Sequence, residues 1–206
     1  MTRLAILGAS GHGKVVADIA ECCGWQSIEF YDDAWPKTKK NGAWEVVGNT
    51  EALISQLKNY DGVVVAIGNN EIRNSKLMEL KDLDAPLVAL VHPSATLSRY
   101  VALGSGSVVM AGVVVNAGTT IGAGAILNTC SSVDHDCRLG DSVHVSPGAR
   151  LAGGVCLGDR SWVGIGASIR HGITIGSNVM VGAGAAVVNN LPNDVTALGV
   201  PAKIKQ

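Results

Sequence analysis

Aromatic residues, long apolar runs and tracts of a single charge are all scarce in this sequence. Phe, Trp and Tyr make up only 4% of the 206 residues, so a hydrophobic core has to be built from aliphatic side chains. No run of about 20 apolar residues is present, which argues against a membrane-spanning helix. The opening residues MTRLAILGAS lead into a strand pattern without the apolar segment and cleavage site of an export signal. We therefore expect a cytoplasmic protein that does not enter a membrane.

The charge balance and the cysteine spacing argue against nucleic acid, structural metal and disulfides. Lys and Arg total 16 against 17 Asp and Glu, and no basic run occurs, so we expect no nucleic-acid partner. No CxxC pair is present, and the cysteines lie among apolar or small residues, which is typical of reduced thiols in a cytosolic protein. The five cysteines are Cys22, Cys23, Cys130, Cys137 and Cys156.

Short apolar strands alternate with helical patterns in residues 1–92. The alternation predicts a Rossmann-like α/β domain, in which a parallel sheet carries helices on its faces. The expected strands are Leu4–Leu7, Ile28–Tyr31, Val63–Ile67 and Leu87–Val91. The expected helices cover residues 15–23, Glu51–Leu57 with Asn49 and Thr50 as candidate caps, and Glu71–Leu83.

A period of six residues replaces this alternation in residues 93–206. Every sixth residue from Leu97 to Val187 is aliphatic, and the residues four positions later, from Val101 to Ala185, are small or β-branched. Such a hexad repeat predicts a parallel β-helix of three hexads per coil, with both positions facing inward. An all-β sandwich with a chance periodicity is the alternative. We expect tight turns at the glycines that follow the aliphatic position, which are Gly104, Gly122, Gly140, Gly158, Gly164, Gly176 and Gly182.

The repeat ends after Val187 and is followed by a tail that contains prolines. We expect this tail to act as a strap over the open edge of the last coil. It carries the motif Gly199-Val200-Pro201-Ala202-Lys203.

Five motifs, in this order, resemble those of one enzyme family. They are Gly8–Gly13, Ala66–Asn70, His92–Ala95, Asn128–Asp136 and Gly199–Lys203. Over residues 3–204 the chain is similar to the hexapeptide-repeat acyltransferases of the NeuD/PglD type, which acetylate sialic acids or bacillosamine sugars. The resemblance implies a left-handed β-helix, acetyl-CoA as co-substrate, no metal, and a homotrimer that binds the acyl donor between adjacent subunits.

His135 is the candidate general base for acetyl transfer. Acetylation of an amine or hydroxyl requires a group that removes a proton, and neutral imidazole does this near pH 7. His135 lies between Asp134 and Asp136, and a carboxylate beside an imidazole raises its basicity. The resemblance implies that Asp136 is the supporting carboxylate, at a position where related enzymes carry Glu, and Asp134 is a second candidate. The plainer alternative is a solvated histidine at a polar corner.

Four residues are candidates for contact with acetyl-CoA. The resemblance places His144 near the thioester and the backbone of Ile165 and Ala183 along the pantetheine arm. Lys203 could meet a phosphate of the coenzyme. The plainer alternatives are a structural corner histidine at His144 and a solvated tail residue at Lys203.

The glycine-rich loop of the first domain is the candidate nucleotide site. It follows a strand and opens a helix, so its N–H groups can bind phosphate, although its GxxGxG spacing is weak evidence for NAD. Two aspartates end the second strand, where such domains bind a ribose, although a polar turn explains them equally well. The resemblance implies contacts to the nucleotide or the sugar from Ser10, Gly11, His12, Asp32 and Asp33. Gly68 and Asn69 lie at the same sheet edge and could supply amide contacts, and Arg73 is a candidate for the diphosphate.

These observations predict an acetyltransferase that acts on the amine of a UDP-linked 4-amino sugar of the bacillosamine type. GDP-linked perosamine and free sialic acid are alternative acceptors. From other classes of function, a zinc lyase of the γ-carbonic anhydrase type would use His135, His144 and His171, and a non-catalytic scaffold would use none of these groups.

Overall fold

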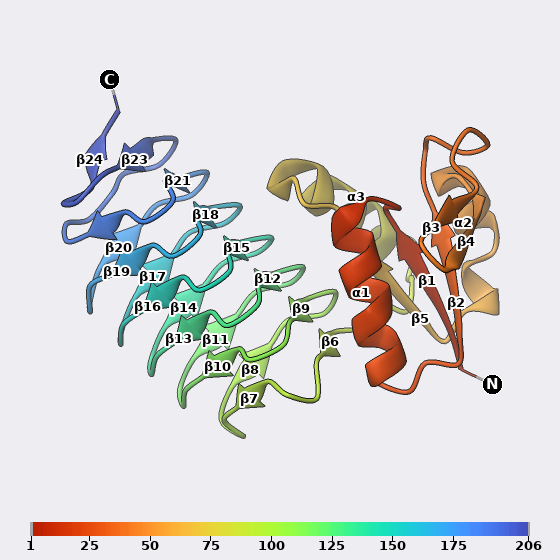
Figure 1. Cartoon of the computed structure of the whole chain (residues 1–206), viewed down its shortest axis with the longest axis horizontal. Helices are drawn as coiled ribbons and strands as arrows, with labels where there is room; N and C mark the ends of the chain where they lie inside the picture. The colour runs from red at the N-terminus through yellow and green to blue at the C-terminus, as the bar shows by residue number, and fades with distance from the viewer. Residues whose placement is uncertain (1, 206) are drawn as a thin grey trace. The chain divides into compact units, whose positions relative to one another are not determined.

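The computed structural model describes residues 2–205 and divides the chain into two compact units. The first unit ends at Pro93 and the second begins at Ser94. Within the described residues no helix combines the length and the apolar character that crossing a membrane requires. Figure 1 shows an α/β sheet in the first unit and a stack of coils in the second.

The first unit is built on a five-stranded sheet in the order β3-β4-β2-β1-β5. Its strands are β1 (Arg3–Leu7), β2 (Ser27–Tyr31), β3 (Lys40–Asn41), β4 (Trp44–Gly48) and β5 (Gly62–Val65). All pairs are parallel except β3 with β4. The helices are α1 (Gly11–Cys22), α2 (Thr50–Ser55), the short 3₁₀ helix η1 (Leu57–Asn59) and α3 (Asn70–Asp82). The predicted α/β class is confirmed.

Two elements of this sheet differ from the prediction. The strand β4 and its partner β3 were not expected, because Lys40 and Glu45 break the apolar pattern of a half-buried edge hairpin. The predicted strand at Leu87–Val91 is wrong in extent. Only Leu87 bridges Val63 of β5, and the two-residue strand β6 (Leu90–Val91) follows. Because β3 and β4 pair in the antiparallel direction, the sheet is mixed at one edge rather than wholly parallel.

The second unit is a parallel β-helix whose coils are 18 residues long. Each strand pairs with the strand one coil away, as Val115 does with Val133 and Leu97. The first sheet contains β7 (Thr96–Leu97), β10 (Val114–Val115), β13 (Ser132–Val133), β16 (Arg150–Leu151), β19 (Ser168–Ile169) and β22 (Ala186–Val187). The second contains β8 (Ala102–Leu103), β11 (Thr120–Ile121), β14 (Arg138–Leu139), β17 (Cys156–Leu157) and β20 (Thr174–Ile175). The third contains β9 (Val108–Val109), β12 (Ile126–Leu127), β15 (His144–Val145), β18 (Trp162–Val163), β21 (Met180–Val181), β23 (Thr196–Leu198) and β24 (Lys203–Ile204).

Both inward positions of the hexad behave as predicted. The aliphatic residues are buried from Val109 onward, whereas Leu97 and Leu103 at the start are only half-buried. The small residues fill the corners, and several of their hydroxyls donate to a carbonyl of the next coil. Ser107 and Ser161, for example, donate to the carbonyl oxygens of residues 122 and 176 at 3.0 and 2.7 Å. These two polar corner residues are thus hydrogen-bonded rather than merely small.

The glycines have a different role from the predicted one. A Cβ atom on Gly104 would lie 2.4 Å from the backbone of Gly122, so glycine here permits the close approach of two coils. The left-handed turn itself lies two residues later, at every sixth position from Gly106 to Gly184. Most of these positions are glycine as well, because L side chains are strained there.

The tail of the chain adds to the third sheet. The strand β23 pairs in parallel with β21, and β24 then pairs with β23 in the antiparallel direction. Leu191 also bridges Ile175 of the second sheet. The tail therefore satisfies backbone groups that the last coil would otherwise leave unpaired.

Candidate active site

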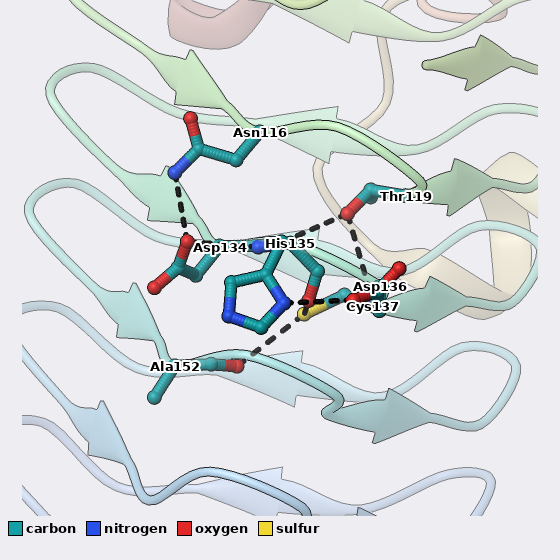
Figure 2. A network of polar contacts seen from close by, with 7 residues as sticks. All are labelled: Asn116, Thr119, Asp134, His135, Asp136, Cys137 and Ala152. Carbon is teal, nitrogen blue, oxygen red and sulfur yellow. Dashed lines mark hydrogen bonds and ion pairs between the residues drawn. The ribbon is translucent and has the colours of Figure 1, made fainter. Parts of the chain in front are cut away.

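The corner that follows β13 holds the three residues Asp134, His135 and Asp136. Figure 2 shows them with their hydrogen-bonding partners in the neighbouring coils. The side chains of His135 and Asp136 are 62% and 73% exposed, so both are open to a substrate. Asp136 has a φ of 58°, and the residues one coil away on either side, Gly118 and Gly154, are glycines with positive φ. A side chain in this strained position marks the corner as different from its neighbours.

The imidazole of His135 is held by the carboxylate of Asp136. The Nδ1 atom of His135 lies 2.8 Å from Oδ2 of Asp136. This hydrogen bond, together with the negative charge of Asp134, raises the pKa of His135 above its ordinary value. The shorter aspartate therefore reaches the ring at the position where related enzymes carry Glu.

Asp134, the second candidate for the supporting carboxylate, does not bond the imidazole ring of His135. Its Oδ1 accepts hydrogen bonds from Nδ2 of Asn116 and from the backbone N–H of His135, both at 2.8 Å. These bonds lower the pKa of Asp134. Asp134 therefore fixes the backbone of the corner, and Asp136 alone bonds the ring among the described residues.

A shallow groove of about 370 Å³ runs along the first sheet beside this corner. Its walls combine polar and apolar side chains, and Asp134 is common to the groove and the corner. It is lined by Asn116, Ser132, Val133, Asp134, Arg150, Leu151, Ala152, Ser168 and Ile169.

His144 is enclosed within the third sheet, and its predicted contact with the thioester stays a prediction. Its side chain points outward from β15, yet the residue is only 7% exposed. The Nε2 atom lies 3.1 Å from Nδ2 of Asn128, and the ring centroid lies 4.5 Å from that of Trp162. The indole of Trp162 is in turn fixed by a 2.6 Å hydrogen bond to Ser146. These contacts fix the orientation of the His144 ring within the third sheet.

The remaining candidates for contact with acetyl-CoA are exposed. Ile165 and Ala183 occupy the same corner in consecutive coils, where the N–H of Gly184 donates to the carbonyl of Ile165 at 2.8 Å. Lys203 lies on β24 and is exposed. The backbone of this corner is accessible for the contacts that the sequence predicts.

In the first unit, the glycine-rich loop is organised by Asp32. The two carboxylate oxygens of Asp32 accept the N–H groups of Ala9 at 2.7 Å and Ala34 at 2.8 Å. Gly8 has a φ of 113°, and a Cβ atom on it would lie 2.7 Å from the carbonyl oxygen of Ala66. Asp32 therefore shapes the loop, and its predicted contact with the ligand stays a prediction.

Ser10 and Gly11 leave the start of α1 open. Ser10 occupies the N-cap position, but its side chain makes no capping hydrogen bond. A Cβ atom on Gly11 would meet no atom within 4 Å. The exposed N–H groups of this helix start can therefore approach an anion closely.

Asp33, Gly68 and Asn69 lie at the ends of β2 and β5. Asp33 is exposed, and its Oδ1 accepts the N–H of Thr50 at 2.9 Å, which is the main cause of its lowered pKa. Asn69 caps α3 by accepting the N–H of Ile72 at 3.0 Å. Gly68 has open space around its Cα atom. Of these residues, Asp33 has the most side chain free for a ligand.

Lys76 was not predicted, because a lysine on the polar face of a helix has no distinguishing sequence signal. Its Nζ atom lies 3.9 Å from Oδ2 of Asp33. The amino group also pairs with Glu79 one turn along α3, at 3.2 Å. Lys76 thus places a positive charge beside Asp33.

The prediction that Arg73 binds a diphosphate does not fit its burial. Arg73 is only 1% exposed, and its guanidinium donates to the carbonyls of Ile67 at 2.9 Å and Gly68 at 3.2 Å. A further bond of 2.8 Å joins it to Oδ1 of Asn70. Arg73 holds the loop between β5 and α3. Burial and, next, the charge of Arg73 lower the pKa of nearby His12 to about 4, so that His12 is neutral at pH 7.

Within residues 2–205 no group of three or more His, Cys, Asp or Glu side chains is arranged to hold a metal ion. Two histidines of the zinc-lyase hypothesis lie in different surroundings, since His135 is exposed at a corner and His144 is enclosed in the third sheet.

Comparison with known proteins finds relatives in both halves of the chain. Residues 3–80 match the PglD N-terminal domain, and residues 154–189 match the six-repeat bacterial transferase hexapeptide. A GDP-perosamine N-acetyltransferase of Escherichia coli O157:H7 is 30% identical over 163 residues, which are 76% of this chain and 73% of that protein. A UDP-N-acetylbacillosamine N-acetyltransferase of Bacillus subtilis is 36% identical over 113 residues, which are 54% of this chain and 52% of that protein.

Two solved structures match nearly the whole chain. The acetyltransferase domain of PglB from Neisseria gonorrhoeae, in complex with acetyl coenzyme A, is 43% identical with a TM-score of 0.95, and the match covers 98% of each chain. PerB from Caulobacter crescentus, in complex with CoA and GDP-perosamine, is 42% identical with a TM-score of 0.95. That match covers 100% of this chain and 98% of PerB.

Proposed function

Because this chain belongs to the NeuD/PglD-like family and is an acetyl-CoA-dependent N-acetyltransferase of nucleotide-linked amino sugars, we propose that His135 is its general base and a UDP-linked 4-amino sugar its acceptor. The observation that carries the base assignment is the 2.8 Å contact between Nδ1 of His135 and the carboxylate of Asp136 at an exposed corner.

This contact leaves the other ring nitrogen free for proton transfer. An ionised carboxylate only accepts hydrogen bonds, so Nδ1 of His135 carries the ring proton. The Nδ1–H group donates a hydrogen bond to Asp136. The Nε2 atom then has an unshared electron pair that takes a proton from the attacking amine. Asp136 stabilises the imidazolium that results.

The reaction requires the transfer of only one proton, from the amine nitrogen to the sulfur of CoA. The amine nitrogen of the sugar bonds to the thioester carbonyl carbon, the carbon–sulfur bond breaks, and the sulfur leaves as the thiolate of CoA. The proton that His135 removes from nitrogen is passed to that sulfur, so the products are an N-acetyl sugar and free CoA. The raised pKa of His135 makes it a stronger base than an ordinary histidine.

The first unit is proposed to hold the nucleotide. Its open helix start at Gly11 can receive phosphate, and Asp33 with neighbouring Lys76 can contact the ribose or the sugar. A UDP-linked acceptor is supported by the bacillosamine enzyme that matches about half of the chain. A GDP-linked amino sugar is the second candidate, because PerB matches over the whole chain.

Two proposals accompany this one, and the first rests on the family resemblance. The enzyme is expected to be a homotrimer that binds acetyl-CoA between adjacent β-helices. Its proposed action in the cytoplasm rests instead on the cysteine spacing, which is typical of reduced thiols. Light scattering of the purified protein gives its mass in solution, and a mass of one or two chains would contradict the trimer.

The decisive experiment combines a variant with a substrate screen. His135→Ala should fold as the wild type and lose about 10²–10⁴ in kcat, the usual contribution of a positioned base. The screen measures thiol release from acetyl-CoA with UDP- and GDP-linked amino sugars and free sialic acid. A variant that keeps more than half of wild-type kcat would overturn the role of His135. Faster turnover of a GDP-linked sugar would replace the proposed acceptor.

A further inference from the structure

The corner that holds His135 and Asp136 repeats in the coils on either side. The position of His135 is occupied by Ala117, Gly153 and His171 in the neighbouring coils. The position of Asp136 is occupied by Gly118, Gly154 and Gly172. Two of these glycines, Gly153 and Gly118, are packed against the reactive side chains themselves.

Gly153 lies against the imidazole of His135. A Cβ atom on Gly153 would lie 2.6 Å from both Cε1 and Nε2 of the ring, which is closer than such atoms can approach. The backbone of Gly153 is not in the left-handed region, so its conformation does not require glycine. The same corner position carries alanine at residue 117. The three atoms nearest to this Cβ position all belong to the His135 ring, so the ring is what a side chain at Gly153 would meet first.

Gly118 lies against the carboxylate of Asp136 on the opposite side. A Cβ atom on Gly118 would lie 2.5 Å from Oδ1, whereas the other oxygen, Oδ2, bonds His135. Gly118 has a φ of 77°, so alanine there also strains the backbone. Gly172 has a φ of 66° and nothing within 4 Å of its Cβ position. The two glycines share the backbone strain, but only Gly118 contacts the pair.

We propose that Gly153 and Gly118 are positioning residues, which set the place of the His135 ring and of the Asp136 carboxylate by lacking a side chain. The proposal deepens the base assignment and rests on it. An added methyl group at Gly153 covers Nε2, the atom that takes the proton, and turns the ring away from Asp136. An added methyl group at Gly118 pushes the carboxylate out of line with Nδ1. Misplacement of a reacting group by about 1 Å can cost about 10² in rate.

The test compares three alanine variants of the full-length enzyme. Gly153→Ala and Gly118→Ala should fold and lower kcat by about 10², with KM for acetyl-CoA changed less than threefold. Gly172→Ala is the matched control, since it has the backbone strain of Gly118→Ala without the contact. The titration of the Cε1 proton of His135, followed by NMR, reports the position of the ring independently of turnover. In Gly118→Ala and Gly153→Ala its midpoint should move to lower pH, because the bond to Asp136 is weakened.

The outcomes separate this proposal from the base assignment. Wild-type kcat and an unshifted titration in Gly153→Ala would overturn the role of Gly153. A loss in Gly118→Ala no larger than in Gly172→Ala would overturn the role of Gly118. A shifted titration together with full activity of His135→Ala would support the positioning and reject the base. If Gly118→Ala does not fold, Gly118→Asn, which tolerates the left-handed region, supplies the same measurement.

Discussion

At the scale of single residues, the site depends on one hydrogen bond between neighbours in the chain. Asp136 bonds Nδ1 of His135, while Asp134 bonds the backbone N–H of the same histidine. The two carboxylates that flank His135 thus have separate roles. One stabilises the charge that forms on the ring, and the other fixes the backbone that carries it.

Replacement of Asp136 by asparagine should move the pH dependence of the enzyme. Neutral imidazole is the active form, so kcat/KM falls as the pH drops through the pKa of His135. Asp136 raises this pKa by favouring the charged ring, and Asp136→Asn should therefore shift the acid limb to lower pH and reduce the plateau rate. Asparagine tolerates the left-handed backbone of this position. The measurement is the pH profile of kcat/KM.

Asp134→Asn is the control for this prediction. It also removes a negative charge near the ring but retains an oxygen that accepts the N–H of His135. Its acid limb should move less. A larger shift in Asp134→Asn than in Asp136→Asn would mean that the direct bond is not the main support of the base.

At the scale of secondary-structure elements, the corner is held by the buried hydroxyl of Thr119 in the preceding coil. Its Oγ1 donates to the carbonyl of Asp134 at 2.8 Å and accepts the N–H of Cys137 at 3.2 Å. These bonds fix the backbone on both sides of His135. A small polar residue at the corner position of the hexad thus connects the regular coil to the site.

Thr119→Val should lower the free energy of unfolding by about 1–3 kcal/mol, because two buried backbone groups lose their partner while the volume is kept. Ser131→Ala is the matched control. Ser131 occupies the same hexad position, but its buried hydroxyl has no hydrogen-bonding partner among residues 2–205, so its removal should cost much less. Urea unfolding curves measure both changes. Equal losses in the two variants would contradict a specific role for the Thr119 hydroxyl.

At the scale of the whole molecule, the two substrates are expected to have separate determinants. Asp33 and Gly11 belong to the unit that ends at Pro93, and the β-helix belongs to the other. Asp33→Ala or Gly11→Val should therefore raise KM for the nucleotide sugar much more than KM for acetyl-CoA. A side chain at Gly11 fits the fold, since its Cβ position is open, yet it blocks close approach of a phosphate.

Asp33 also supports the fold, because its Oδ1 accepts the N–H of Thr50 at the start of α2. Asn49→Ala is the control for the loss of this structural contact. Asn49 caps the same helix start by accepting the N–H of Ala52. Its loss should cost about 1 kcal/mol of stability without a selective change in KM. Steady-state kinetics with each substrate varied in turn decide the matter. Equal rises in both KM values for Asp33→Ala would show that the first unit does not hold the acceptor.

The sequence by itself determined the architecture of this protein. The hexad from Leu97 to Val187 determined the β-helix, because side chains that repeat at a fixed period have to stack between equivalent coils. The alternation of strands and helices determined the α/β class of the first unit. The contact between His135 and a flanking carboxylate could also be predicted from the sequence, because residues next to His135 in the chain are next to it in space.

Only the tertiary structure decided how the other polar residues are used. Arg73 has the residue type of a ligand-binding group, but its burial gives it structural contacts. Gly153 lies 18 residues from His135 in the chain and directly against its ring in space. Contacts of this kind depend on how adjacent coils pack and on which side chain is missing between them. A linear pattern reports the period of the coils, whereas the distances between their side chains are set only when the coils are stacked.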